Sequence, residues 1–78
     1  MLIRSQDRTK LVDISGKTIA VSETSIKIVY ANSYIRLGMY DNKEKSFKVL
    51  DMIEEMYKNL KSDSGHVVFN MPQNEDIK

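Results

Sequence analysis

Side chains that could carry catalysis are few in this sequence, and they form no recognised catalytic pattern. His66 is the only histidine, and Ser64, two residues before it, could serve as a nucleophile activated by that histidine. Such a pair also needs a carboxylate that orients the histidine and a loop that binds an oxyanion, and we identify neither. We therefore interpret His66 as a polar residue that opens a strand, and we expect that the protein is not an enzyme.

Metal and cofactor sites are also poorly supported. With one histidine and no cysteine, the chain lacks the usual ligands of zinc and other transition metals. Asp41 and Asn42 do not begin a calcium-binding loop, because the D-x-[DN]-x-[DN]-G pattern is absent. Gly16, Gly38 and Gly65 are isolated, whereas phosphate-binding loops need glycines at fixed spacing. We expect no cofactor and no metal.

The length and composition indicate one small globular domain. The 78 residues are 41% hydrophobic and 29% charged, a balance typical of folded proteins. No apolar run approaches the roughly 18–20 residues that span a membrane, and the start is not a signal peptide, so we expect a cytoplasmic protein without membrane contact. A domain this short without disulfides is commonly stabilised by self-association, which favours a homo-oligomer.

One segment, Asp41 to Leu60, has the periodicity of an amphipathic helix. Its apolar side chains fall on one face at about 100° per residue; they are Val49, Leu50, Ile53, Met56, Tyr57 and Leu60. Asp41 followed by Glu44 is typical of a capping box at a helix start. Ser62–Gly65 ends the segment. The pattern therefore predicts one helix with a single buried face.

Short apolar runs separated by turn residues indicate strands on both sides of this helix. They extend from Leu2 to Tyr40, and one more, Val67 to Met71, follows the helix. Short connections favour antiparallel hairpins. We therefore expect an α+β fold over residues 1–72, with an antiparallel sheet of about five strands (β-β-β-β-α-β) and the helix on one face. The edge to which the last strand pairs stays open, and we expect residues 73–78 to be a polar, disordered tail.

Three apolar residues fall outside the predicted core and could form an interaction surface. Phe47 and Met52 lie off the helical stripe, and Val29 has the opposite strand parity from Ile26 and Ile28. Together they favour a surface that contacts another protein or a second copy of the chain. The alternative is that they are ordinary scattered surface hydrophobic residues.

Tyr34, Arg36 and Tyr40 share the parity of one expected strand and form a second candidate surface. Aromatic and cationic side chains on a sheet face can stack bases and hold phosphates, as single-strand nucleic-acid binders do. Tyrosine is also a favoured strand residue, and the net charge is only +1. Nucleic-acid binding is therefore an alternative that we do not favour.

Four short motifs carry a resemblance to a known group of proteins. They are Ile3–Asp7, Leu37–Tyr40, Val49–Ile53 and Phe69–Pro72. Over roughly residues 2–72 the chain resembles short, uncharacterised proteins of Gram-positive bacteria and their phages. The resemblance implies an intracellular, phage-derived protein without an assigned activity, and it brings no catalytic residues. With the absence of a catalytic constellation, it favours a non-enzymatic interaction or accessory protein that binds itself or a protein partner.

Overall fold

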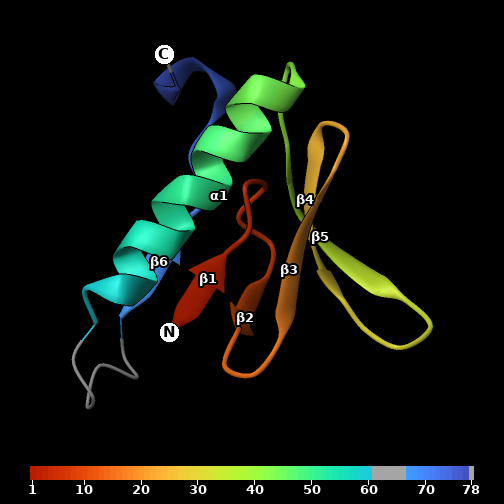
Figure 1. Cartoon of the computed structure of the whole chain (residues 1–78), viewed down its shortest axis with the longest axis vertical. Helices are drawn as coiled ribbons and strands as arrows, with labels where there is room; N and C mark the ends of the chain where they lie inside the picture. The colour runs from red at the N-terminus through yellow and green to blue at the C-terminus, as the bar shows by residue number, and fades with distance from the viewer. Residues whose placement is uncertain (61–66, 78) are drawn as a thin grey trace.

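One long helix and six short strands form an α+β fold in the computed structural model, which describes residues 1–60 and 67–77 (Figure 1). The elements in chain order are β1 (Leu2–Arg4), β2 (Leu11–Asp13), β3 (Thr18–Ser22), β4 (Ser25–Val29), β5 (Tyr34–Met39), α1 (Lys43–Lys58), β6 (Val68–Asn70) and the 3-10 helix η1 (Asn74–Asp76). No helix within these ranges is long and apolar enough to cross a membrane.

The described strands form two three-stranded sheets, so the expectation of a single sheet of about five strands is wrong. One sheet has the order β2-β1-β6 and the other β3-β4-β5. All neighbours are antiparallel except β1 and β6, which run parallel (Figure 1). A parallel pair needs a long crossover, and the segment that contains α1 supplies it. With β2 and β6 on its two edges, β1 has no edge left for pairing with β3, β4 or β5.

The helix α1 begins two residues later than the sequence predicts. The side chain of Asn42, not Asp41, caps it by accepting a hydrogen bond from the Lys45 backbone N–H at 2.9 Å. The Asp41 carboxylate instead lies 3.3 Å from the Lys45 ammonium nitrogen. Asparagine and aspartate cap helices about equally well, so local preference alone does not decide between two neighbouring candidates.

The buried face of α1 is also displaced from the predicted stripe. Ser46, Val49 and Ile53 are buried, whereas Met56 and Tyr57 at the far end are 37% and 55% exposed. Ser46 tolerates burial because its hydroxyl donates a hydrogen bond, 3.4 Å long, to the carbonyl oxygen of Asn42. A pattern based on hydrophobicity does not detect a buried serine. The predicted apolar stripe therefore lies too far toward the C-terminus of α1.

The core lies between α1 and the two sheets and includes residues from both ends of the chain. Its buried hydrophobic members are Met1, Ile3, Ile14, Ile26, Ile28, Leu37, Tyr40, Val49, Ile53, Phe69, Met71 and Ile77. The predicted disordered tail contrasts with this packing, because η1 is regular and Ile77 is only 8% exposed. Burial of Ile77 and a hydrogen bond from the Asp41 N–H to Asn74 Oδ1 hold the segment in place. Lys78 lies outside the described residues.

Gln6 joins the two sheets to the C-terminal segment. Its backbone N–H donates to the Leu37 carbonyl at 2.7 Å, and its side-chain oxygen accepts from the Met39 N–H at 2.9 Å, so two bonds reach β5. Its side-chain nitrogen donates to the Pro72 carbonyl at 3.4 Å, and its carbonyl accepts from Gln73 Nε2 at 2.8 Å. We call this set of four bonds the Gln6 junction.

Replacing Gln6 with alanine should lower the free energy of unfolding by about 1–2 kcal/mol, because it removes two side-chain hydrogen bonds and leaves the Met39 N–H without its protein acceptor. Urea denaturation measures the change as a lower midpoint at constant slope. Asn70→Ala is the control, since it removes only an exposed bond from Arg8. An equal loss of stability in both variants would contradict a special role for Gln6.

Candidate functional site

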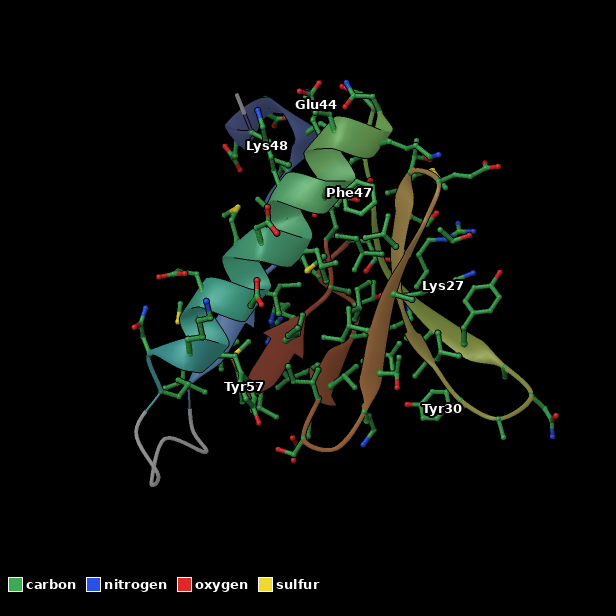
Figure 2. All side chains as sticks on the ribbon, viewed as in Figure 1. Lys27, Tyr30, Glu44, Phe47, Lys48 and Tyr57 are labelled. Carbon is green, nitrogen blue, oxygen red and sulfur yellow. The ribbon has the colours of Figure 1, made fainter. Side chains whose placement is uncertain are left out.

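One face of the sheet β3-β4-β5 is not covered by any described element. The helix α1 contacts β3 and β4 on the opposite face, where Ile26 and Ile28 are buried. Figure 2 shows Lys27 on the side of the sheet turned away from the helix. We call the uncovered side the open sheet face; by strand alternation and register it consists of Thr18, Ala20, Ser22, Ser25, Lys27, Val29, Tyr34, Arg36 and Met39.

Two cations oppose each other at the centre of the open sheet face. Lys27 on β4 and Arg36 on β5 are cross-strand partners, and the face contains no acidic residue. Like charges directly opposite one another destabilise a sheet. The Lys27 ammonium nitrogen lies 4.4 Å from the centre of the Tyr34 ring, a cation–π contact that offsets part of this cost. The pairing of β4 with β5 therefore places two cationic side chains next to each other on the open sheet face.

A hollow of about 230 Å³ adjoins the open sheet face at Arg36 and Met39. It also borders Gln6, Leu37 and Gly38 and the turn that carries Asp7 and Lys10. We call it the corner pocket. It brings Lys10, together with its ion-pair partner Asp7, to the edge of the open sheet face.

The carboxylate of Asp7 forms its hydrogen bonds within its own turn. Its Oδ1 accepts hydrogen bonds from the Ser5 hydroxyl at 2.7 Å, the Thr9 N–H at 3.0 Å and the Thr9 hydroxyl at 2.7 Å, while Oδ2 lies 3.8 Å from the Lys10 ammonium nitrogen. These bonds, that from Ser5 first, hold the pKa of Asp7 well below its usual range. Asp7 is therefore an ionised, structural group of the turn, where Arg8 adopts a φ of +68°.

Tyr40 is not on the open sheet face, so the predicted set of Tyr34, Arg36 and Tyr40 is not brought together. The register of β5 against β4 shifts by one residue at Leu37, where Lys27 pairs with Arg36 but Ile26 pairs with Gly38. This β-bulge reverses the side-chain alternation that follows. Tyr40 is 3% exposed, and its hydroxyl donates to the Pro72 carbonyl at 2.9 Å.

Gly38 provides the space that Tyr40 occupies. A Cβ at position 38 would lie 3.1 Å from the Tyr40 hydroxyl oxygen and 3.3 Å from the Met71 methyl carbon. Real Cβ atoms seldom approach neighbours this closely, so glycine is favoured beside the bulge. The inward position of the Tyr40 side chain beside the bulge therefore depends on the absence of a side chain at Gly38.

Phe47, Met52 and Val29 are exposed but do not form one surface. Their exposed fractions are 52%, 44% and 40%. Phe47 and Met52 are five residues apart on α1, which places them about 140° apart around the helix. Val29 lies on the open sheet face, away from α1. Of the three, only Val29 lies on the same face as Lys27 and Arg36.

Other candidates from the sequence fall outside this surface. Ser64 and His66 lie outside the described residues. No cluster of three or more histidine, cysteine, aspartate or glutamate side chains suited to a metal occurs within residues 1–60 and 67–77. The sequence does not predict that Met39 and Lys10 lie at this surface, because their positions depend on the bulge and on the corner pocket. No local pattern signals either feature, although the strand parity of Lys27 is visible in the sequence.

Comparison of the chain with protein-family models, with curated proteins and with solved structures finds no match. The chemistry of the open sheet face must therefore be argued from its own geometry.

Replacing Tyr40 with phenylalanine should cost about 0.5–1.5 kcal/mol of unfolding free energy at neutral pH, because it removes the bond to Pro72. Burial raises the pKa of Tyr40 from its ordinary value of 10 to about 12. Folding therefore favours the neutral phenol, and this stabilisation is complete below about pH 10 and is lost as the pH rises towards 12.

The wild type should thus lose more stability than Tyr40→Phe between about pH 10 and 12, as measured by urea denaturation along the pH scale. Tyr34→Phe is the matched control, because within the described residues its hydroxyl has no hydrogen bond. The assignment is wrong if Tyr34→Phe, rather than Tyr40→Phe, flattens the alkaline loss.

Proposed function

We propose that this chain is a non-enzymatic interaction protein and that its open sheet face binds an acidic segment of a protein partner. The opposed pair of Lys27 and Arg36 carries the proposal, since no acidic side chain on that face neutralises it. The resemblance to short proteins of Gram-positive bacteria and their phages supports an accessory role of this kind.

An anionic group between Lys27 and Arg36 would replace a repulsive contact with two attractive ones. A cross-strand pair changes stability by about 0.2–1 kcal/mol, so the repulsion is a modest cost in the free protein. A carboxylate bound by both cations forms charge-assisted hydrogen bonds, which are roughly twice as strong as neutral ones. Binding of an anion therefore relieves the repulsion between Lys27 and Arg36, and the new hydrogen bonds contribute to the affinity.

The remaining side chains of the face suit a peptide better than a nucleic acid. Val29 is 40% exposed and Met39 45%, and each offers apolar contact area to a partner's side chains. Tyr34 is the one aromatic residue on the face, and Lys27 already lies over its ring. Single-strand binders use several aromatic platforms in a strongly basic groove, which this face does not provide.

Arg36→Gln should weaken binding of a peptide of alternating glutamate and valine by about tenfold, equivalent to about 1.4 kcal/mol, while leaving the unfolding free energy equal to or above that of the wild type. Relief of the repulsion with Lys27 is the reason for the second result. Fluorescence anisotropy and urea denaturation measure the two quantities.

Lys43→Gln is the matched control for charge, because Lys43 is exposed at the start of α1 and lies off the open sheet face. It should bind the peptide as the wild type does. Equal weakening by Arg36→Gln and Lys43→Gln would show that only the net charge matters and would remove the site.

A second candidate function is single-strand nucleic-acid binding by the same face, which Tyr34, Lys27 and Arg36 favour. It requires affinity for oligothymidylate or oligouridylate that rises steeply as salt is lowered, and that Tyr34→Leu reduces. From the single aromatic residue, we expect no measurable binding at physiological salt. Tight binding under those conditions would replace the acidic peptide with a nucleic acid as the ligand.

A further inference from the structure

The outer edge of β3 carries backbone groups that no described strand uses. β3 ends its sheet, with β4 on one side and no described strand paired on the other. A two-residue turn, 23–24, joins β3 to β4, so the flanking residues Ser22 and Ser25 form a hydrogen-bonded pair. By alternation, the N–H and C=O groups of Ile19 and Val21 point away from β4, and they have no hydrogen-bond partner within the described residues.

β3 also lacks the features that commonly keep a free edge from pairing. Edge strands of natural sheets are usually short or carry charged residues, proline or a bulge. β3 spans five residues, contains neither charge nor proline, and pairs with β4 without a bulge. The edge of β5, by contrast, has a bulge and bonds to Gln6, and β2 and β6 span three residues each. Among the described edges, that of β3 is therefore best suited to accept another strand.

The residue types of β3 form a palindrome. From Thr18 to Ser22 the strand reads hydroxyl, β-branched aliphatic, alanine, β-branched aliphatic, hydroxyl. An antiparallel copy centred on Ala20 places hydroxyl opposite hydroxyl and β-branched opposite β-branched side chain, and both kinds of pair stabilise a sheet. A two-fold interface requires a surface that is complementary to itself. The palindrome therefore indicates a second copy of the chain, rather than an unrelated strand, as the occupant of this edge.

We propose that this chain forms a symmetric dimer in which the β3 strands of two copies pair antiparallel about a two-fold axis at Ala20. In this register Ile19 of each copy lies opposite Val21 of the other, and their outward N–H and C=O groups bond to one another. Ala20 faces its own copy in a non-hydrogen-bonded pair, in which the Cα atoms are only about 4.5 Å apart, so a small side chain fits. The two sheets become one, with both helices on one side and both open sheet faces on the other.

This register keeps the cations of the two open sheet faces apart. Ala20 lies opposite Lys27, which lies opposite Arg36, so the alanine pair separates the Lys27 side chains of the two copies. Three strand spacings amount to about 14 Å, which exceeds the Debye length of about 8 Å at physiological ionic strength. Repulsion between the copies is therefore weak. The dimer does not rest on the proposed acidic partner, because its contact uses the edge of β3 and not Lys27 or Arg36.

Charges placed on the axis test the dimer by sedimentation equilibrium of the full chain. The wild type should dimerise at high micromolar concentration, while Ala20→Glu and Ala20→Lys should each be monomeric, since the axis brings each new charge against its own copy. An equimolar mixture of the two variants should dimerise again, because glutamate then meets lysine. Ala20→Glu gains Lys27 as a cross-strand partner within its own chain, so its fold should be retained, which circular dichroism checks.

A disulfide tests the register of the paired strands. The chain has no cysteine, so a single introduced thiol can pair only between copies. The Cα separation expected at the axis lies within the range of about 4.4–6.8 Å that a disulfide spans. Under mild oxidation, Ala20→Cys should therefore form a covalent dimer about tenfold faster than Ala31→Cys, as measured by non-reducing electrophoresis. Ala31 is exposed in the connection between β4 and β5 and lies off the edge of β3.

Ala31→Glu is the matched control for charge and should dimerise as the wild type does. So should Arg36→Gln, which separates this result from a failure of the acidic-partner proposal. A monomeric wild type would overturn the dimer and leave the edge of β3 to a strand of another protein. Dimers that neither charged variant at position 20 weakens, a mixture that stays monomeric, or equal rates of cross-linking at positions 20 and 31 would overturn it as well.

Discussion

The fold depends on Gln6, which links the sheet β2-β1-β6, the sheet β3-β4-β5 and the C-terminal segment. None of these three parts is large enough to be stable by itself. A three-residue strand such as β1 or β6 offers few ladder hydrogen bonds, and a small sheet needs an apolar face covered by another element. The Gln6 junction supplies the missing connection by bonding to β5 on one side and to Pro72 and Gln73 on the other. Both sheets and the C-terminal segment can then share one core under α1.

The side chains of the proposed binding surface lie outside this framework. Residues that stabilise the fold, such as Gln6 and Tyr40, form hydrogen bonds through their polar groups with other residues of the chain. Lys27 and Arg36 instead face one another at a cost to stability.

Sequence patterns predicted the α+β class and the helix, because helical periodicity is local. They failed where distant residues decide the outcome. The bulge at Leu37 reverses the alternation that placed Tyr40 beside Tyr34, and burial of Ser46 moves the covered face of α1. Ile77 makes η1 part of the core, although the segment around it is polar. The exposure of Val29 followed from parity, because β4 is regular over its whole length.

The parallel pairing of β1 with β6 has a consequence for the order in which the chain folds. Ile3 is matched with Phe69, so β1 cannot complete this pairing until β6 has been synthesised. Contacts of such wide sequence separation form late, because the chain must close a long loop before they stabilise anything. The hairpins of β3, β4 and β5 are local and can form during synthesis. The edge of β1 that β6 occupies thus stays accessible to chaperones or to aggregation until β6 emerges.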